Sequence, residues 1–142
     1  FPADYQGVER ERRKTCGLQL YQAVKITRED EAGKRNQFLE NFRLFGAPHV
    51  ALVTAPTYLG FYAALDCGLY VNNFMLAAKS LGIDTIAQAA IAHYSDFVRE
   101  YFGIAEDRKL VCGVSFGYED KELPINRYRT GRAKLDEVVT WR

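Results

Sequence analysis

Polar and apolar positions recur with helical spacing through the first third of the chain. A charged stretch over residues 9–14 comes first, and Asp4 before it is a candidate helix N-cap. The apolar residues that follow at helical spacing are Leu18, Tyr21, Ala23 and Val24. This pattern predicts one helix here and a second over about 28–44. In the second segment, the side chains spaced as one buried face are Phe38, Leu39, Phe42 and Phe45.

The periodicity changes after Gly46-Ala47-Pro48, because proline cannot continue the hydrogen-bond ladder of a helix. Residues 49–54 are rich in β-branched and other apolar side chains, which favours a strand buried on both faces, and Pro56 should stop it. Residues 61–81 are apolar around the whole circumference of a helix that Gly82 should end. We therefore expect this long helix to be central.

The rest of the chain predicts shorter elements. They are an extended segment over 83–92, a brief helix over 97–102, a strand over 109–116, a polar loop over 117–132 and an apolar, β-prone end over 135–141. Ser95 or Asp96 should cap the brief helix, and Gly103 should close it. With no repeat and no low-complexity linker, this order predicts a single domain over 1–142. Its fold class is α+β, with a mostly antiparallel or mixed sheet packed by helices.

The charge balance and the cysteines narrow the class of protein. Lys and Arg number 19 against 18 Asp and Glu, whereas nucleic-acid binders carry a basic surplus, so we expect no nucleic-acid partner. No apolar run reaches the length of about 18 residues that a membrane span needs, so we expect no membrane insertion. The chain has 3 cysteines, which predicts reduced thiols packed as small hydrophobes in a cytoplasmic protein.

Two apparent motifs predict no chemistry. The stretch Gly113-Val114-Ser115-Phe116-Gly117 matches the serine-hydrolase elbow, but that elbow needs a helix after the serine and a histidine downstream. Here a loop follows, and His49 and His93 both lie upstream. The histidines also lack the spacing of a metal site, so we expect no metal and predict that each is packed or solvated.

Three arginines near the end of the chain leave two interpretations open. Arg127, Arg129 and Arg132 lie close together beside Asn126 and Gly131. Guanidinium groups on a loop next to glycine suit a monoester phosphate, which takes bidentate hydrogen bonds. The alternative is a solvated loop with scattered charge.

A series of motifs resembles the FMN-dependent nitroreductase family. In chain order they are FGAPHV over 45–50, DCGLYVNNFMLAA over 66–78, LGIDTIAQAA over 81–90, VREYFGI over 98–104, VSFGY over 114–118, NRYRTGR over 126–132 and LDEVV over 135–139. The nitrobenzoate-reductase-like branch is most similar, through Gln88-Ala89-Ala90 and the start that bears Tyr5, Arg10, Arg12 and Arg13. The series resembles the C-terminal two-thirds of a member. The family's N-terminal segment and the proline-rich segment after it have no counterpart in the sequence, and Ala87 replaces a proline common in the family.

The resemblance implies an α+β homodimer that binds FMN in clefts built by both protomers, with the long apolar helix at the dimer core. It implies that Gln88, Ala89 and Ala90 offer backbone N–H groups to the N5 and O4 edge of the flavin. Arg132 would grip the FMN phosphate, and Arg129 is the next candidate. The cofactor would carry a hydride from NAD(P)H to a nitroaromatic or quinone, and the resemblance assigns no catalytic side chain.

Two further hypotheses remain open. The chain could be a truncated dimeric flavin-binding domain without turnover, because the N-terminal cations that stabilise charge on the reduced flavin in the family have no counterpart here. Alternatively, the resemblance could report only the fold, and the domain would be an interaction module that uses its apolar helix.

Overall fold

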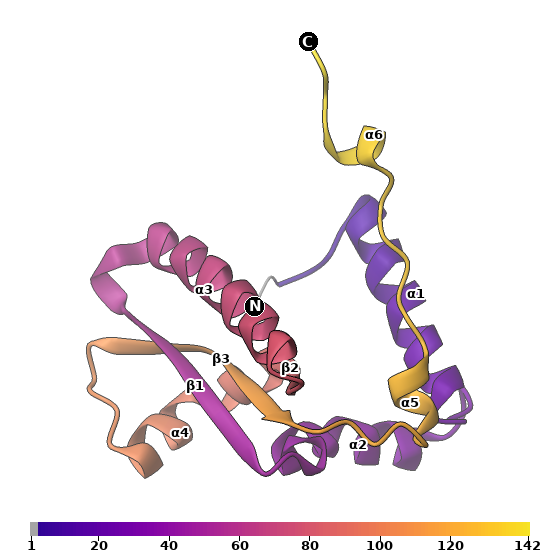
Figure 1. Ribbon diagram of the computed structural model, residues 1–142, viewed down its shortest axis with the longest axis horizontal. Coiled ribbons are helices and arrows are strands. Elements are labelled where there is room, and N and C mark those ends of the chain that lie inside the picture. The colour runs from indigo at the N-terminus through magenta and orange to yellow at the C-terminus, as the bar shows by residue number, and fades with distance from the viewer. Residues whose placement is uncertain (1–2) are drawn as a thin grey trace. The chain divides into compact units, whose positions relative to one another are not determined.

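The computed structural model describes residues 3–142, which divide into two compact units (Figure 1). One unit is residues 35–119, and the other combines residues 3–34 with 120–142. Helices and a small antiparallel sheet confirm the α+β class. In the described part of the chain, no helix is long and apolar enough to cross a membrane.

An antiparallel sheet lies at the centre of unit 35–119. Its strands are β1 (His49–Pro56), β2 (Asp84–Gln88) and β3 (Arg108–Gly117), with β3 between the other two. The predicted strands at 49–54 and 109–116 are confirmed. The extended segment predicted over 83–92 is too long, because the 3₁₀ helix η3 (Ala89–Tyr94) replaces its second half.

A bulge in β3 changes which side chains share a face of the sheet. Val53 pairs with Cys112, and the next residue, Thr54, pairs with Leu110, so that Val111 is an extra residue. Cys112 therefore shares a face with Val53, and Leu110 shares the opposite face with Thr54. Because of this shift, Leu110 joins the cluster of Ile91 and Val98, although Cys112, two residues along, packs on the opposite face.

Each face of the sheet packs against helices. On one face, α3 (Gly60–Ser80) completes a buried cluster of Val53, Ala55, Ala63, Cys67 and Val114. On the other face, η3 and α4 (Ser95–Phe102) complete a cluster of Ile91, Val98 and Leu110. Val50 and Leu52 pack against the second cluster, so β1 contributes to both faces as predicted.

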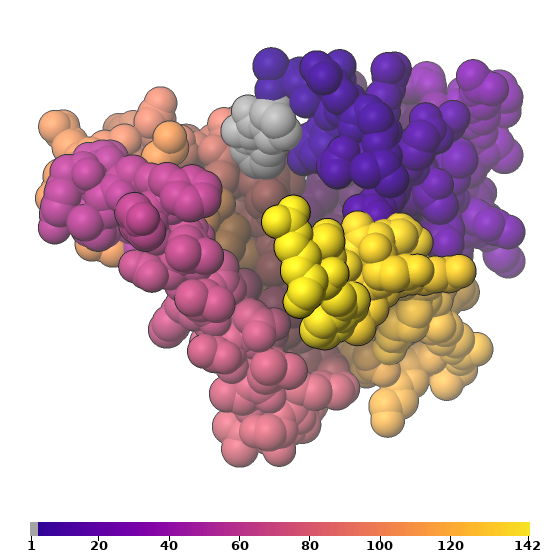
Figure 2. Space-filling model, turned by 90° about the horizontal axis from the view of Figure 1, so that it is seen from above, coloured from indigo at the N-terminus to yellow at the C-terminus, as the bar shows by residue number. Residues whose placement is uncertain are grey.

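The long helix α3 confirms the prediction for 61–81, and Gly82 follows it with φ 77°. Its expected central position is wrong for the described chain, because α3 contacts the sheet along one side only and buries Ala63 and Cys67. Figure 2 shows the helix, in magenta and pink, as a ridge on the surface. The large exposed side chains of α3 include Leu65, Leu69 and Leu76, which are 49%, 60% and 63% exposed.

The helix predicted over 28–44 is interrupted. It forms α2 (Glu31–Leu39), which runs across the boundary of the two units, and then the 3₁₀ segment η1 (Glu40–Gly46). Leu44 and Phe45 then end the helical backbone, because their φ of 56° and 52° are not allowed in an α-helix. The buried face predicted for this segment is also wrong. Three of its four side chains are exposed, namely Phe38, Leu39 and Phe42.

The second unit is built from short helices and loops. Its elements are α1 (Gly7–Ala23), the first turn of α2, α5 (Pro124–Arg127) and α6 (Leu135–Val138), and α5 contacts α1. The N-cap of α1 is Gln6 and not Asp4, whose Oδ1 accepts the Tyr5 N–H at 2.8 Å instead. The β-prone end forms α6 and pairs with no strand in residues 3–142.

The cysteines are free thiols, but only two are packed as predicted. Cys67 is buried and Cys112 half-buried in the cluster beneath α3, whereas Cys16 is exposed. Burial raises the pKa of the Cys112 thiol above its ordinary value of 9.0, and the neighbouring Cys67 adds to the increase. The core therefore favours the neutral form of Cys112.

We expect the free energy of unfolding to fall as pH rises from about 8 to about 10, and less steeply in Cys112→Ala. Below its ordinary pKa, the thiol is neutral in both the folded and the unfolded chain. Above it, the unfolded chain releases the proton first, so the stabilisation is lost as pH approaches the raised pKa. Denaturant titrations at several pH values test this. Burial also raises the pKa of Tyr128, but that group titrates in both proteins, so the difference in slope reports Cys112.

Gly113 permits the close packing of η3 on β3. A Cβ there would lie 2.5 Å from Ile91 Cδ1 and 3.4 Å from Val50 Cγ2, and Ile91 is itself buried. We expect Gly113→Ala to lower the free energy of unfolding by about 1–3 kcal/mol, measured by denaturant titration. Gly17→Ala is the control, since nothing lies within 4 Å of its added Cβ within α1. A Gly113→Ala protein as stable as the wild type would contradict the overlap.

Candidate functional site

The side chain of Gln88, at the end of β2, is held inside unit 35–119. It is 2% exposed, and its Nε2 donates to the backbone oxygen of Asn41 at 2.8 Å. Its Oε1 accepts a hydrogen bond from the Ser115 hydroxyl. Both ends of the amide are therefore paired within the protein, and a ligand at this position would contact backbone and not this side chain.

The two residues that follow Gln88 begin η3. Ala89 is exposed and Ala90 is partly exposed, so this strip of backbone reaches the surface of the unit. Their small side chains allow a flat group to approach the backbone closely. This geometry agrees with the backbone role predicted for Gln88, Ala89 and Ala90, which stays a prediction.

Sequence reasoning missed Ser115 and Asn41 as partners of Gln88. Ser115 is 1% exposed inside β3, as the strand prediction required. The strand continues to Gly117 and no helix begins directly after the serine, so the serine-hydrolase interpretation is excluded. The sequence did contain one signal for Ser115. A serine in a strand predicted to be buried needs a hydrogen-bond partner, because buried polar groups are paired. Asn41 gave no such signal, since it lies in a segment predicted as an ordinary helix.

Aromatic side chains lie next to Asn41, the partner of Gln88. Phe42, the residue after Asn41, packs edge-to-face on Tyr94 with ring centroids 5.2 Å apart, and Phe38 packs on Phe42 at 5.5 Å. All three rings are exposed in part. A planar apolar ligand would find stacking and edge contacts here. Elsewhere, His49 is exposed and stacks on Phe116, in agreement with its prediction as a packed or solvated histidine.

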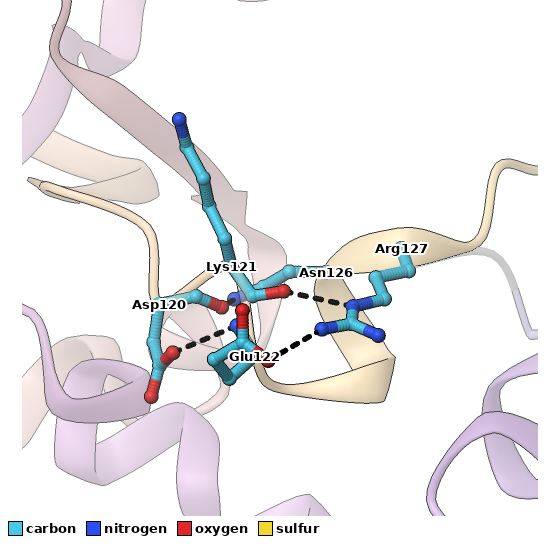
Figure 3. Close-up of polar contacts among 5 residues, drawn as sticks. All are labelled: Asp120, Lys121, Glu122, Asn126 and Arg127. Atoms are coloured by element: carbon cyan, nitrogen blue, oxygen red, sulfur yellow. Dashed lines mark hydrogen bonds and ion pairs between the residues drawn. The ribbon is translucent and has the colours of Figure 1, made fainter.

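The side chain of Arg127 forms hydrogen bonds within the turn of residues 120–127. Its Nε donates to the Lys121 carbonyl oxygen at 2.8 Å, and its terminal nitrogen donates to Glu122 at 2.9 Å (Figure 3). Asn126 Nδ2 donates to the Asp120 carbonyl oxygen at 2.9 Å in the same turn. These contacts stabilise the turn. Of the three arginines, Arg127 therefore has the fewest free donors for a phosphate.

Arg129 and Arg132 have a different set of partners. Arg129 donates to the carbonyl oxygens of Asn126 and Tyr128, and Arg132 donates to Thr130 and to the Gly131 carbonyl oxygen. No carboxylate of residues 3–142 forms an ion pair with either one. Each guanidinium is exposed and keeps donors for an anion, which fits a phosphate chemically. The solvated loop fits equally, so the phosphate role stays a prediction.

The predicted site residues fall in different units. Gln88, Ala89 and Ala90 belong to unit 35–119, and Arg129 and Arg132 belong to the unit of residues 3–34 and 120–142. Each set has a geometry that suits its predicted part of FMN. That both sets bind the same FMN molecule is a prediction.

Comparisons with known proteins identify the family. Residues 3–118 match the Nitroreductase family. Nitroreductase NfnB of Mycolicibacterium smegmatis is 41% identical over 135 residues, which are 95% of this chain and 57% of that protein. A 4-nitrobenzoate reductase of Pseudomonas putida is 32% identical over 93% of this chain and 58% of its own length. The chain thus spans somewhat more than half the length of these curated relatives.

Solved structures agree with the sequence comparisons. The FMN and NADPH-dependent nitroreductase NfnB from Sphigopyxis sp. strain HMH superimposes with a TM-score of 0.97 at 32% identity, covering 100% of this chain and 64% of that one. The FMN-dependent nitroreductase NfnB from Mycobacterium smegmatis, in complex with NADPH, has a TM-score of 0.94 at 39% identity, covering 100% and 65%. The chain therefore belongs to the nitroreductase family.

Proposed function

We propose that this protein is an FMN-dependent nitroreductase that transfers a hydride from NAD(P)H, through FMN, to a nitroaromatic or quinone acceptor. The observation that carries the proposal is the match along the whole chain to an FMN-dependent nitroreductase solved with NADPH, at 39% identity and a TM-score of 0.94. The relatives named for 4-nitrobenzoate support a nitroaromatic acceptor.

This chain's residues would bind and orient the cofactor, and FMN would supply the hydride chemistry when bound. The backbone of Gln88, Ala89 and Ala90 would line the flavin edge, because their side chains are either buried or small. Arg132 and Arg129 would hold the phosphate, because neither has a carboxylate partner among residues 3–142. The exposed rings of Phe42 and Tyr94 would keep water from the adjoining apolar surface.

We include a homodimer in the proposal, with α3 at the contact between copies. The support is the exposed apolar ridge on α3, since a large exposed apolar patch marks an interaction surface. We also place both units in one nitroreductase domain and the protein in the cytoplasm. Three free thiols are compatible with a reducing compartment.

Flavin titration tests the proposal. The purified chain should bind FMN, acquire the visible absorbance of a flavoprotein and release FMN on denaturation. It should bind riboflavin, which lacks the phosphate, at least 10-fold more weakly, because charge-assisted hydrogen bonds are lost. Adding NADPH and nitrobenzoate should then produce turnover.

Two other results would argue against the proposed activity. Stoichiometric FMN binding without NADPH oxidation would favour a flavin-binding domain without turnover. A chain that takes up no FMN at any concentration would overturn the proposed function.

A further inference from the structure

A directional series of hydrogen bonds runs from the middle of the sheet to α2. The Ser115 hydroxyl on β3 donates to Gln88 Oε1, and Gln88 Nε2 donates to the Asn41 backbone oxygen at 2.8 Å. Asn41 Nδ2 then donates to the Phe38 backbone oxygen at 3.0 Å. All four residues lie in unit 35–119. We refer to Ser115, Gln88, Asn41 and Phe38 as the amide relay.

The direction of the relay fixes the orientation of the Gln88 amide. The Asn41 backbone oxygen can only accept, so the nitrogen of Gln88 must face it and the carbonyl oxygen must face Ser115. Ser115 then supplies the donor that this buried carbonyl oxygen needs. Gln88 is 2% exposed and Ser115 1% exposed, so water has little access to replace the hydroxyl.

The relay joins the two segments that border the proposed flavin edge. On one side, Gln88 directly precedes Ala89 and Ala90. On the other side, Asn41 lies in η1, which contains the left-handed residues Leu44 and Phe45. Neither residue is glycine, so this backbone is costly and persists only where surrounding contacts hold it. The bond from Gln88 to Asn41 is one such contact.

We propose that Ser115 is a positioning residue: through Gln88 it holds Ala89 and Ala90 and the η1 segment in the arrangement that receives the flavin. The proposal rests on the proposed function for the identity of the ligand. Its structural part concerns this chain's own residues and can be measured without flavin. Ser115 acts by orienting Gln88 and does not itself contact the cofactor.

The matched pair of variants is Ser115→Ala and Val114→Ala. The two residues are adjacent in β3, each is 1% exposed, and Val114 belongs to the cluster beneath α3 on the opposite face. Both changes remove buried atoms, but only Ser115→Ala removes a donor from the relay. A general loss of stability would therefore appear in both variants, and a loss of positioning in one.

The first measurement uses the chain without FMN. Ala47 N–H donates to the Leu44 carbonyl oxygen at 3.0 Å, so its hydrogen exchange reports on η1. We expect Ser115→Ala to speed exchange at Ala47 at least 10-fold relative to amides of β1, and to shift the NMR signals of the Ala89 and Ala90 amides. Val114→Ala should change exchange in β1 and η1 together. Unchanged exchange at Ala47 in Ser115→Ala would overturn the proposal.

The second measurement is FMN titration of the same variants. Ser115→Ala should weaken FMN binding about 10-fold and shift the visible absorbance of the bound flavin, whereas Val114→Ala should bind as the wild type does. If the wild type binds FMN and Ser115→Ala binds it equally with the same spectrum, the positioning role is refuted. If the wild type binds no FMN, the proposed function fails, and the exchange result still decides whether Ser115 holds the two segments.

Discussion

Arg132→Ala is expected to weaken FMN binding roughly 10- to 100-fold, because a hydrogen bond to a charged group contributes about 1.5–3 kcal/mol. Arg132 is exposed and donates to the Thr130 hydroxyl at 2.7 Å and to backbone oxygens, and it has no ion-pair partner in residues 3–142. Removing it should therefore leave the fold intact and take away a phosphate ligand. Arg129→Ala should have the same effect or a smaller one. The measurement is the dissociation constant from a fluorescence titration of FMN.

Two controls separate a phosphate contact from a general effect of charge. Arg142→Ala removes one positive charge elsewhere in the same unit and should leave FMN affinity unchanged. Riboflavin lacks the phosphate, so Arg132→Ala and the wild type should bind it equally. A loss of affinity for riboflavin as large as that for FMN, or unchanged FMN affinity, would return Arg132 to the solvated-loop interpretation.

Leu69→Glu is expected to convert a dimer into a monomer at micromolar concentrations. Leu69 is 60% exposed on α3 and does not belong to the cluster that packs on the sheet. The change should therefore not disturb the core of the chain. In an apolar contact between copies, a buried unpaired carboxylate would cost several kcal/mol. Analytical ultracentrifugation of both proteins measures the effect.

The control is Leu18→Glu, because Leu18 is 59% exposed, nearly the same fraction as Leu69, and belongs to α1 and not to α3. It should leave the association state unchanged. A wild-type chain that sediments as a monomer would exclude both the dimer and a flavin site that needs two copies. A Leu69→Glu protein that remains dimeric would place the contact on another surface.

The parts of the fold that the sequence predicted well depend on local pattern. The β-branched run 49–54, the alternating run 109–116 and the apolar run 61–81 form β1, β3 and α3. The helix predicted over 28–44 was wrong in its second half, where the 3₁₀ segment η1 forms and a distant residue contacts it. Asn41 in η1 is held by Gln88, 47 positions along the chain, and no local pattern specifies that partner.

The candidate site shows the same difference between what the sequence predicts and what only the contacts in the structure reveal. The comparisons confirm the nitroreductase family on which the resemblance relied. The FMN contacts that it implies stay a prediction for Gln88, Ala89, Ala90, Arg129 and Arg132. Sequence reasoning did not separate Arg127 from its neighbours. The structure separates them, because Arg127 is paired with Glu122 and the carbonyl oxygen of Lys121.

The sequence by itself determined the fold class, the main strands, the long helix and the family, since hydrophobic periodicity and ordered motifs are written along the chain. Only the tertiary structure decided how the strands register around a bulge in β3 and which polar groups meet in the core. A hydrogen bond such as that between Ser115 and Gln88 depends on residues 27 positions apart reaching neighbouring strands, and burial then makes the pairing necessary.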